Sequence, residues 1–570
     1  MNADSCNTST NCRSVFVPRS ANSNTAYNFL PFAHIDNVDS HCFNGGFEIG
    51  YEYQGSFDSP SLARGLFGSH NLLFQGSQVA DRDTRALIAD NFGLSPLFTG
   101  LLNINPHIKR QNLHFQSFFG FDNWVSGLFG QVNGTFSHEN RSLVEKCSTL
   151  DTQSTSTTQF PIGYMSAFQD LATNHIHTAL SGDFWFGDMQ TTWRFGRFKF
   201  CDQIENGVAG VDIILGYDFL RCAPYHFGLY GLYVAPTGNR AGVTNVFSPV
   251  VGNGHHHEVG GGLTAHLEFW NNDNGHSMAF YLDGQVTTLL RSNQIRSFDF
   301  TGKGCLSRYM LLKDLVTPSV IAADGFDFND ILINGINFAT RNVSSKVAVR
   351  GDASLRFIFH SSDWDIGLGY NIYGQSSENL CLFSEISCDD SIGISGRHFG
   401  FKGCTGTTCY SYITTATTSV FKATNGTTTS ANLLNATASS ATATSCGNVD
   451  NPVTERSDNG TAAGTVCIDW KNQLTGNGQP ANAITSGTLL STLVVANTSQ
   501  PSVEVTVDAL NLSSGSAPRQ LTHKGFVTLN YTWSGCNWKP YLATGIEVEG
   551  GSRTTDLKLW GAWIKTGISF

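Results

Sequence analysis

The sequence lacks the features that mark the most common soluble and membrane-spanning classes. Charged residues make up only 14% of its 570 residues, little more than half of the roughly one quarter typical of soluble domains. It contains no Lys/Arg run and its pI is about 5.8, which excludes a basic nucleic-acid binder. No stretch approaches the roughly 18–20 apolar residues of a spanning helix. Disorder is excluded too, because aromatics reach 12% and the net charge is only −11.

Motifs for catalysis and metal binding are also missing. The GxSxG, HExxH, Walker A and Rossmann patterns are absent, so we predict no enzyme, no catalytic residue and no cofactor. A Ser/His/Asp triad assembled in space from separate strands stays open. The cysteines show no CxxC pair or zinc-finger spacing. Of the cluster His255–Glu258, at most His255 and His257 converge, because consecutive strand residues point to opposite faces. No metal site is predicted.

The 14 cysteines instead indicate an oxidising compartment, since an even number accompanies a Ser/Thr/Asn-rich chain. Residues Met1–Cys6 show neither a basic nor an apolar signal region, so we expect the mature form of an exported protein. Asn-x-Ser/Thr sequons leave open a rival interpretation, a secreted eukaryotic or viral glycoprotein. Sequons such as Asn133 and Asn530 fall on predicted strands, which ranks that interpretation second.

The dominant positive signal is alternation. From Trp364 to Ile372 every second residue is apolar, and the residues between are Asp, Gly or Asn. Such a strand has one apolar face and one polar face. The same pattern recurs in Phe47–Tyr53, Val211–Phe219, Met278–Leu290 and Val347–Phe359. These runs suit the about 9–11 residues of a tilted membrane-spanning strand better than the 5–6 usual in soluble sheets.

The connections between these runs alternate in length. We expect tight turns at Ser534–Asn537, His360–Ser362, Asn271–His276, Arg221–Tyr225, Gly187–Gln190 and Asp122–Ser126. We expect longer loops at Gly550–Thr555, Gln375–Lys524, Ser292–Ser345, Ala235–His257, Cys201–Gly207 and His138–His177. Turns at one rim and loops at the other predict an all-β, up-and-down antiparallel transmembrane barrel with long extracellular loops. Counting back from Phe570, with a weak strand in Phe16–Phe32 and another over Thr191–Phe200, gives about 16 strands, within roughly 14–18.

The end of the chain adds a discrete motif, because Trp560, Ala562, Ile564, Thr566, Ile568 and Phe570 share one parity. Here the sequence resembles Gram-negative bacterial outer-membrane β-barrels of the porin type, whose closing strand ends in an aromatic residue. The resemblance implies a multi-pass barrel in the bacterial outer membrane and a C-terminal signal for the insertion machinery formed by Trp560, Ile564, Ile568 and Phe570. It also implies a homo-oligomer, which we take as a trimer. The alternative fold is a soluble β-sandwich.

Four segments follow from these signals. Residues 1–42 form an N-terminal segment with a possible first strand, 43–374 the barrel strands and loops, 375–524 an extracellular insertion, and 525–570 the closing strands. The insertion is Thr/Ser-rich and is either a disulfide-stapled excursion or a mostly flexible tract. Its disulfide candidates are Cys381, Cys388, Cys404, Cys409, Cys446 and Cys467, for which 15 pairings are open. Short helices are expected in Met165–Ile176 and Asp81–Gly93.

The inward faces carry more acidic than basic residues. The predicted pore-lining set is Glu48, Glu52, Asp212, Asp218, Glu268, Asp283, Lys346, Arg350, Asp352, Arg356, Asp363 and Asp365. In a water-filled lumen this excess would favour cations. Alternatively, the charges pair across strands and fill the lumen.

These patterns predict a porin-like channel for passive diffusion of small hydrophilic solutes that is also a major surface protein. Expected partners are outer-membrane lipid, small hydrophilic solutes and further copies of the chain, with no nucleic acid. Disulfide-linked neighbours are an added hypothesis, through Cys6, Cys12, Cys42, Cys222 and Cys536. The competing function is a structural surface-lattice or adhesin protein whose barrel is a plugged membrane anchor, and the size of the 375–524 insertion favours it.

Overall fold

The computed structural model describes three main stretches of the chain: 12–27, 44–383 and 507–570. Within them, gaps fall at 77–78, 80–82, 84, 145–150, 154–170, 188, 273–274, 317–326, 534–537 and 552–556. Four short strands are also described, β18 (His398–Phe401), β19 (Ser411–Thr414), β20 (Ser419–Lys422) and β21 (Leu493–Val495). The predictions on Cys388, Cys404, Cys409, Cys446 and Cys467, and on most of the 165–176 helix, lie outside the described residues.

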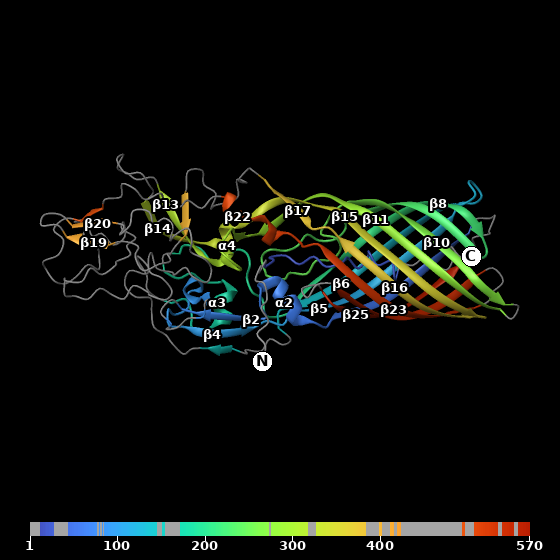
Figure 1. Ribbon diagram of the computed structural model, residues 1–570, viewed down its shortest axis with the longest axis horizontal. Helices are drawn as coiled ribbons and strands as arrows, with labels where there is room; N and C mark the ends of the chain where they lie inside the picture. Colours follow the sequence, from blue (N-terminus) through green and yellow to red (C-terminus); the bar gives the residue numbers. More distant parts are fainter. Residues whose placement is uncertain are drawn as a thin grey trace.

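Twelve antiparallel strands form a closed barrel (Figure 1). Neighbouring strands follow one another in chain order, and the pairings β1–β25 and β11–β15 complete the circle. The strands are β1 (Asn44–Ser56), β5 (His107–Gly120), β6 (Leu128–Ser142), β8 (Gln203–Cys222), β9 (Tyr225–Ala235), β10 (Glu258–Asn272), β11 (His276–Ser297), β15 (Thr340–Ser361), β16 (Trp364–Gln375), β23 (Gln520–Thr532), β24 (Lys539–Gly551) and β25 (Leu559–Ser569).

The predicted count of about 16 strands is wrong, and two segments account for two of the surplus strands. The described part of Phe16–Phe32 runs inside the barrel without forming a strand. Residues Thr191–Phe200 contain only an isolated bridge, from Arg197 to Asn245, so Gly187–Gln190 does not connect two barrel strands. Alternation of apolar and polar residues indicates an extended segment whose two faces have different surroundings. It does not indicate whether that segment forms hydrogen bonds with a neighbouring strand of the barrel.

Four of the six predicted tight turns do join consecutive barrel strands, and all four lie at one end of the barrel. A fifth, Ser534–Asn537, falls between β23 and β24 but lies outside the described residues. At the other end lie the connections 57–106, 143–202, 236–257, 298–339, 376–519 and 552–558. In a transmembrane barrel the end with long connections faces outside the cell. We call it the external end.

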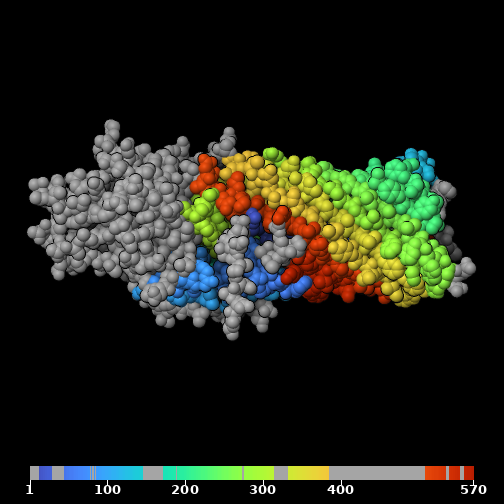
Figure 2. Space-filling view, in the orientation of Figure 1, coloured from blue at the N-terminus to red at the C-terminus, as the bar shows by residue number. Residues whose placement is uncertain are grey.

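Beyond the external end of the barrel, the long connections fold into a cap (Figures 1 and 2). We define the cap as the described residues of 57–106, 143–202, 298–339 and 507–516. Its elements are α2 (Ser59–Phe67), β2 (Asn71–Gln75), β3 (Leu87–Ile88), η1 (Ala89–Phe92), β4 (Thr99–Asn103), β7 (Asp151–Gln153), α3 (Ile176–Ser181), β12 (Asp299–Phe300), η2 (Ser307–Tyr309), β13 (Leu311–Val316), β14 (Asp327–Asn334), α4 (Gly335–Phe338), η3 (Val507–Ala509), β22 (Leu510–Asn511) and η4 (Leu512–Gly515). The connection after β16 also supplies β17 (Glu378–Leu382), which pairs with β15.

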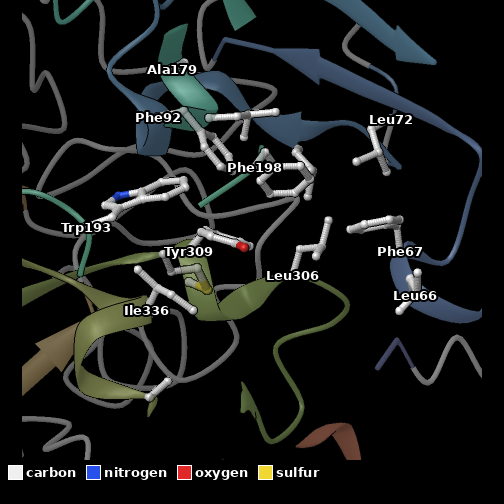
Figure 3. Packing of buried hydrophobic residues seen from close by; sticks show 14 of the residues in the cluster. Leu66, Phe67, Leu72, Phe92, Ala179, Trp193, Phe198, Leu306, Tyr309 and Ile336 are labelled. Carbon is white, nitrogen blue, oxygen red and sulfur yellow. The ribbon is translucent and has the colours of Figure 1, made fainter. Parts of the chain in front are cut away.

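The cap has a conventional apolar core drawn from several connections (Figure 3). The rings of Trp193 and Tyr309 lie 4.7 Å apart, and Phe92 lies 6.0 Å from Trp193. In the described residues of 81–93, the expected helix is replaced by β3 and the 3-10 turn η1, which ends at Gly93 with a φ of 72°. A left-handed residue cannot continue a helix, and glycine adopts that conformation at no steric cost.

The barrel wall has the opposite polarity. Along β16 the apolar residues are exposed on the outer face, and the residues between them are mostly buried. Leu368 is 63% exposed and Ile366 is 53% exposed. Only a hydrocarbon surrounding makes such an outer face favourable, and a closed sheet satisfies its backbone groups there. Among the described residues, no helix is both long and apolar enough to cross a membrane.

Candidate transport lumen and its plug

The inner wall of the barrel is polar and strongly charged because every second strand residue points inward. Ten acidic and seven basic residues of the twelve strands are buried there. The acidic residues are Glu48, Glu52, Glu139, Asp212, Asp218, Glu258, Asp283, Asp352, Glu547 and Glu549, and the basic ones are Arg110, Arg141, Arg296, Arg350, Arg356, Lys524 and Lys565. The acidic excess expected from the sequence is therefore present on this surface.

An N-terminal segment, residues 12–27, occupies the interior of this wall, and we call it the plug. At its external end, Cys12 forms a disulfide with Cys305 of the cap. The backbone N–H of Ser14 then donates to the carbonyl of Ser514 at 2.8 Å. Further in, Arg141 of β6 donates to the carbonyl of Phe16 at 3.0 Å. The plug thus enters from the cap and continues between the strands.

Arg19 is the main electrostatic contact between plug and wall. Its guanidinium forms an ion pair of 2.6 Å with Asp352 and lies 3.7 Å from Glu549. It also donates to Asn371 at 2.8 Å and stacks over the Tyr373 ring at 4.8 Å. A buried charge is tolerated only when it is paired and hydrogen-bonded. All of these partners belong to the wall, so Arg19 ties the plug to β15, β16 and β24.

The next plug residues extend this polar network. Thr25 donates to Asp352 through its hydroxyl at 2.9 Å and through its backbone N–H at 3.2 Å. Asn22 donates to Asp212 of β8. The plug therefore bridges walls that lie on different sides of the barrel, since β8 and β15 are separated by several strands.

Lys524 of β23 organises a second charged group. Its ammonium lies 2.7 Å from Glu547 and 3.4 Å from Glu549, and it donates to plug residue Asn24 at 3.2 Å. Glu52 belongs to the same group, because Gln54 donates to both Glu52 and Glu547, at 3.0 and 3.1 Å. Without the plug, these three carboxylates and one ammonium give this part of the wall a net negative charge.

Tyr27 ends the described part of the plug and packs against β1, β5 and β25. Its ring stacks on His114 at 4.1 Å and meets Trp563 edge-on at 5.5 Å. A Cβ at Gly50 would lie only 1.5 Å from the Tyr27 hydroxyl. Glycine at position 50 is therefore what lets the ring reach the wall.

The lumen is closed at this level. Glu52 and Arg141 have no exposed surface, and Lys524 is 1% exposed. Charges in a continuous wide water path would be solvated, whereas these are covered by one another and by the plug. The described interior therefore follows the second alternative, in which paired charges fill the lumen.

The structure places eight of the twelve predicted pore-lining residues on the buried inner wall, and the rest elsewhere. The buried residues are Glu48, Glu52, Asp212, Asp218, Asp283, Arg350, Asp352 and Arg356. Glu268, Asp363 and Asp365 are half-buried near the end with short turns. There Asp365 pairs with His360 at 2.6 Å and accepts from Asn530 at 2.7 Å.

The prediction that Lys346 faces inward is wrong, because Lys346 is exposed on the outer wall. The β11–β15 register shifts between Thr287/Leu289 and again between Leu289/Ser292. Each shift is a β-bulge, with two residues on one strand opposite a single residue on the other, and it reverses the parity of the bulged strand. Strict alternation from Arg350 therefore assigns Lys346 to the wrong face.

The residues that the sequence missed belong mainly to the plug. The sequence pattern assigns Arg19 and Tyr27 to a weak strand, and it leaves Lys524 at the end of the 375–524 insertion. A usable signal existed for Arg19, which stands in a segment without alternation. The barrel supplies its acidic partners from sequence positions more than 300 residues away, so pattern alone could not pair them.

The other predicted features are placed as follows. Trp560 and Ile564 are exposed on the outer face of β25, and the backbone of Phe570 pairs with Gly45 at 2.9 Å in both directions. Cys12 is bonded within the chain to Cys305, which corrects its assignment to links between molecules. Cys381 and Cys222 are free thiols. His255, His256 and His257 contact Gly238, Leu290 and Tyr233, respectively.

Comparisons with known proteins are distant. No family model and no curated protein matches the chain. Similar solved structures include an outer membrane channel from Pseudomonas putida F1, with 9% identity, coverage of 92% of this chain and 96% of that chain, and a TM-score of 0.33. A Pseudomonas aeruginosa FadL homologue has 7% identity, 98% coverage of each chain and a TM-score of 0.26. The outer membrane protease OmpT from Escherichia coli has 7% identity, coverage of 93% and 96%, and a TM-score of 0.19.

These identities and TM-scores are too low to assign the chain to a class of protein. The class follows from the chain's own geometry. A closed antiparallel barrel with an apolar outer face, a charged interior and short turns at one end is a transmembrane β-barrel. The protein is an outer-membrane β-barrel of the bacterial type.

Proposed function

We propose that the chain is an outer-membrane channel for small hydrophilic solutes, closed by the plug and opened when the plug moves. The observation that carries the proposal is the polar character of the plug–wall contact. Arg19, Asn22, Asn24 and Thr25 all meet the wall through hydrogen bonds or ion pairs. Water can replace such contacts, whereas it cannot replace the apolar contacts of a sealed core.

The cost of burying charge supports the same proposal. Replacing buried ion pairs with apolar residues is often neutral or stabilising. A barrel that served only as an anchor would be at least as stable with an apolar interior. A charged inner wall becomes favourable when it is solvated, and the ten acidic against seven basic wall residues then favour cations.

The experiment is single-channel recording in planar bilayers, with the full chain compared with variant R19Q and with a deletion of residues 2–27. We expect rare, brief openings in the full chain, more frequent openings in R19Q, and a steady, cation-selective conductance in the deletion. R85Q is the matched control, because Arg85 is an exposed cap arginine with an ion pair of 2.8 Å to Asp83. Its conductance should equal that of the full chain.

A folded, inserted deletion variant that remains silent would refute the channel. The second candidate would then lead: a surface protein whose barrel anchors the cap. It is favoured by the folded apolar core that the external connections build above the barrel. It predicts that loss of the cap abolishes attachment or surface packing while the barrel still inserts.

A further inference from the structure

Two unpaired basic residues, Arg291 and Lys346, lie side by side on the outer wall of the barrel. The second β11–β15 register shift places Leu290 and Arg291 together opposite the single residue Lys346. Arg291 and Lys346 are both exposed. The bulge therefore aims both side chains away from the lumen.

Neither charge is neutralised by a residue that the structure describes. Across the described residues, neither Arg291 nor Lys346 has an ion pair or a side-chain hydrogen bond. The residue paired with Lys346 on its other side is Asn379 of β17, which is uncharged. Like charges directly opposite one another on paired strands destabilise the pairing. An anion between them would remove that repulsion.

Arg291 and Lys346 lie at the edge of the apolar outer face that is nearer the external end. Val286 and Leu290 of β11 are 60% and 42% exposed on the outer face, and Val349 of β15 is 53% exposed. Beyond the pair, toward the external end, the exposed residues of β11 and β15 are Asn293, Ile295 and Asn342. The outer face thus changes here from apolar to mostly polar, as it does where hydrocarbon meets lipid headgroups.

His257, which directly precedes β10, lies at the same level of the outer wall and adds a third hydrogen-bond donor. The N–H of Leu290 donates to the carbonyl of His257 at 2.8 Å, so His257 lies beside the pair. His257 is exposed, and its Nδ1 lies 2.8 Å from the hydroxyl of Tyr233. Outward tyrosines are typical of the membrane–water interface, where the ring is apolar-facing and the hydroxyl is wet.

We propose that Arg291 and Lys346, with His257 beside them, bind the phosphate of an outer-leaflet lipid headgroup. Arginine and lysine complement phosphate through charge-assisted hydrogen bonds. The acyl chains of the same lipid would lie along Val286, Leu290 and Val349. The site is independent of the lumen, so it stands whether or not the barrel conducts.

The test is native mass spectrometry of the full chain with diphosphoryl lipid A, with fully dephosphorylated lipid A as the second probe. The full chain should retain the diphosphoryl form and not the dephosphorylated one. The double variant R291Q/K346Q should bind the diphosphoryl form roughly tenfold to thirtyfold more weakly. Both residues are exposed, so the variant should keep the heat-modifiable migration of a folded barrel.

Lys109 provides a matched control, because it is an exposed lysine on β5, on the opposite side of the barrel. K109Q should retain lipid as the unaltered chain does. Equal binding by R291Q/K346Q, or equal binding of both lipid forms, would overturn the proposal. Saturable binding of inorganic phosphate without lipid retention would replace it with a free-anion site. A dimer that only the double variant loses would replace it with an interface between copies.

Discussion

The barrel wall and the cap sort their side chains in opposite directions. In the cap, Phe98 and Ile336 have no exposed surface and pack among other apolar residues. In the wall, Glu52 is fully buried, and Leu368 faces outward with 63% exposure. The same chain follows both rules because the cap is surrounded by water and the wall by hydrocarbon. Burial alone therefore says little about which residues stabilise a region until its solvent is known.

The largest expected effect is a core deletion in the cap. F98A should destabilise the cap by about 3–5 kcal/mol, through lost burial and an unfilled cavity. Limited proteolysis should then cleave the cap while the barrel keeps its heat-modifiable migration. F115A is the control, because Phe115 lies on the outer wall with 47% exposure. If the cap of F98A stays as protease-resistant as that of F115A, the cap does not depend on this core.

A charge placed on an exposed leucine should separate the two surroundings. L368R puts a cation on the lipid-facing wall and should cost about 2–4 kcal/mol of folding free energy in bilayers. L97R changes a leucine of the cap that is 41% exposed, and should stay within about 0.5 kcal/mol. Urea unfolding in lipid vesicles measures both. Equal costs would mean that Leu368 does not face hydrocarbon.

The third prediction compares the two faces of the wall. G50A forces the Tyr27 ring away from β1, because the added Cβ would lie 1.5 Å from its hydroxyl. We expect a loss of about 1–3 kcal/mol from overpacking, together with more frequent channel openings. G525A is the matched change, since nothing lies within 4 Å of a Cβ there. Planar-bilayer recording that shows no difference between the two would disconnect Tyr27 from closure.

The smallest effect concerns the junction between wall and cap. Asp58 caps α2 and accepts from Ser61, and it pairs with Lys558. The hydrogen bond from Lys558 lowers the pKa of the Asp58 carboxyl. Its contribution is therefore present above the unfolded-state pKa of about 3.9, and is lost as pH falls through the lower folded-state value.

D58N removes the titrating carboxyl group and destabilises the N-terminus of α2 by about 1 kcal/mol. Cap stability measured by proteolysis at pH 7 and below pH 4 should therefore fall more steeply in the unaltered chain than in D58N. K303Q is a suitable control, because Lys303 lies elsewhere in the cap and burial lowers its pKa to about 8. Parallel pH profiles for all three chains would contradict the assigned role of Asp58.

Much of the wall was predictable, because a membrane imposes a local rule on every strand. The alternation from Trp364 to Ile372 correctly predicts which face of β16 is apolar. The rule failed at Lys346, because a bulge in β15 between Val347 and Arg350 changed the parity. A bulge depends on the pairing of two strands, and neither strand's own sequence marks it clearly.

The cap and the plug were much harder to predict, because their contacts join distant parts of the chain. Residue Trp193 was assigned to a barrel strand, although it packs in the cap against Tyr309 at 4.7 Å. The residues that form ion pairs and a hydrogen bond with Arg19 come from β15, β16 and β24. No periodic pattern connects residues at such separations.

Composition and alternation alone determined that this chain is a transmembrane barrel with an apolar outside and an acid-rich inside, because each strand residue meets either lipid or lumen. The tertiary structure decided the number of strands, the occupation of the lumen by residues 12–27 and the outward position of Lys346. These depend on which segments become neighbours when the barrel closes, and that choice is made by hydrogen bonds and ion pairs between residues far apart in sequence.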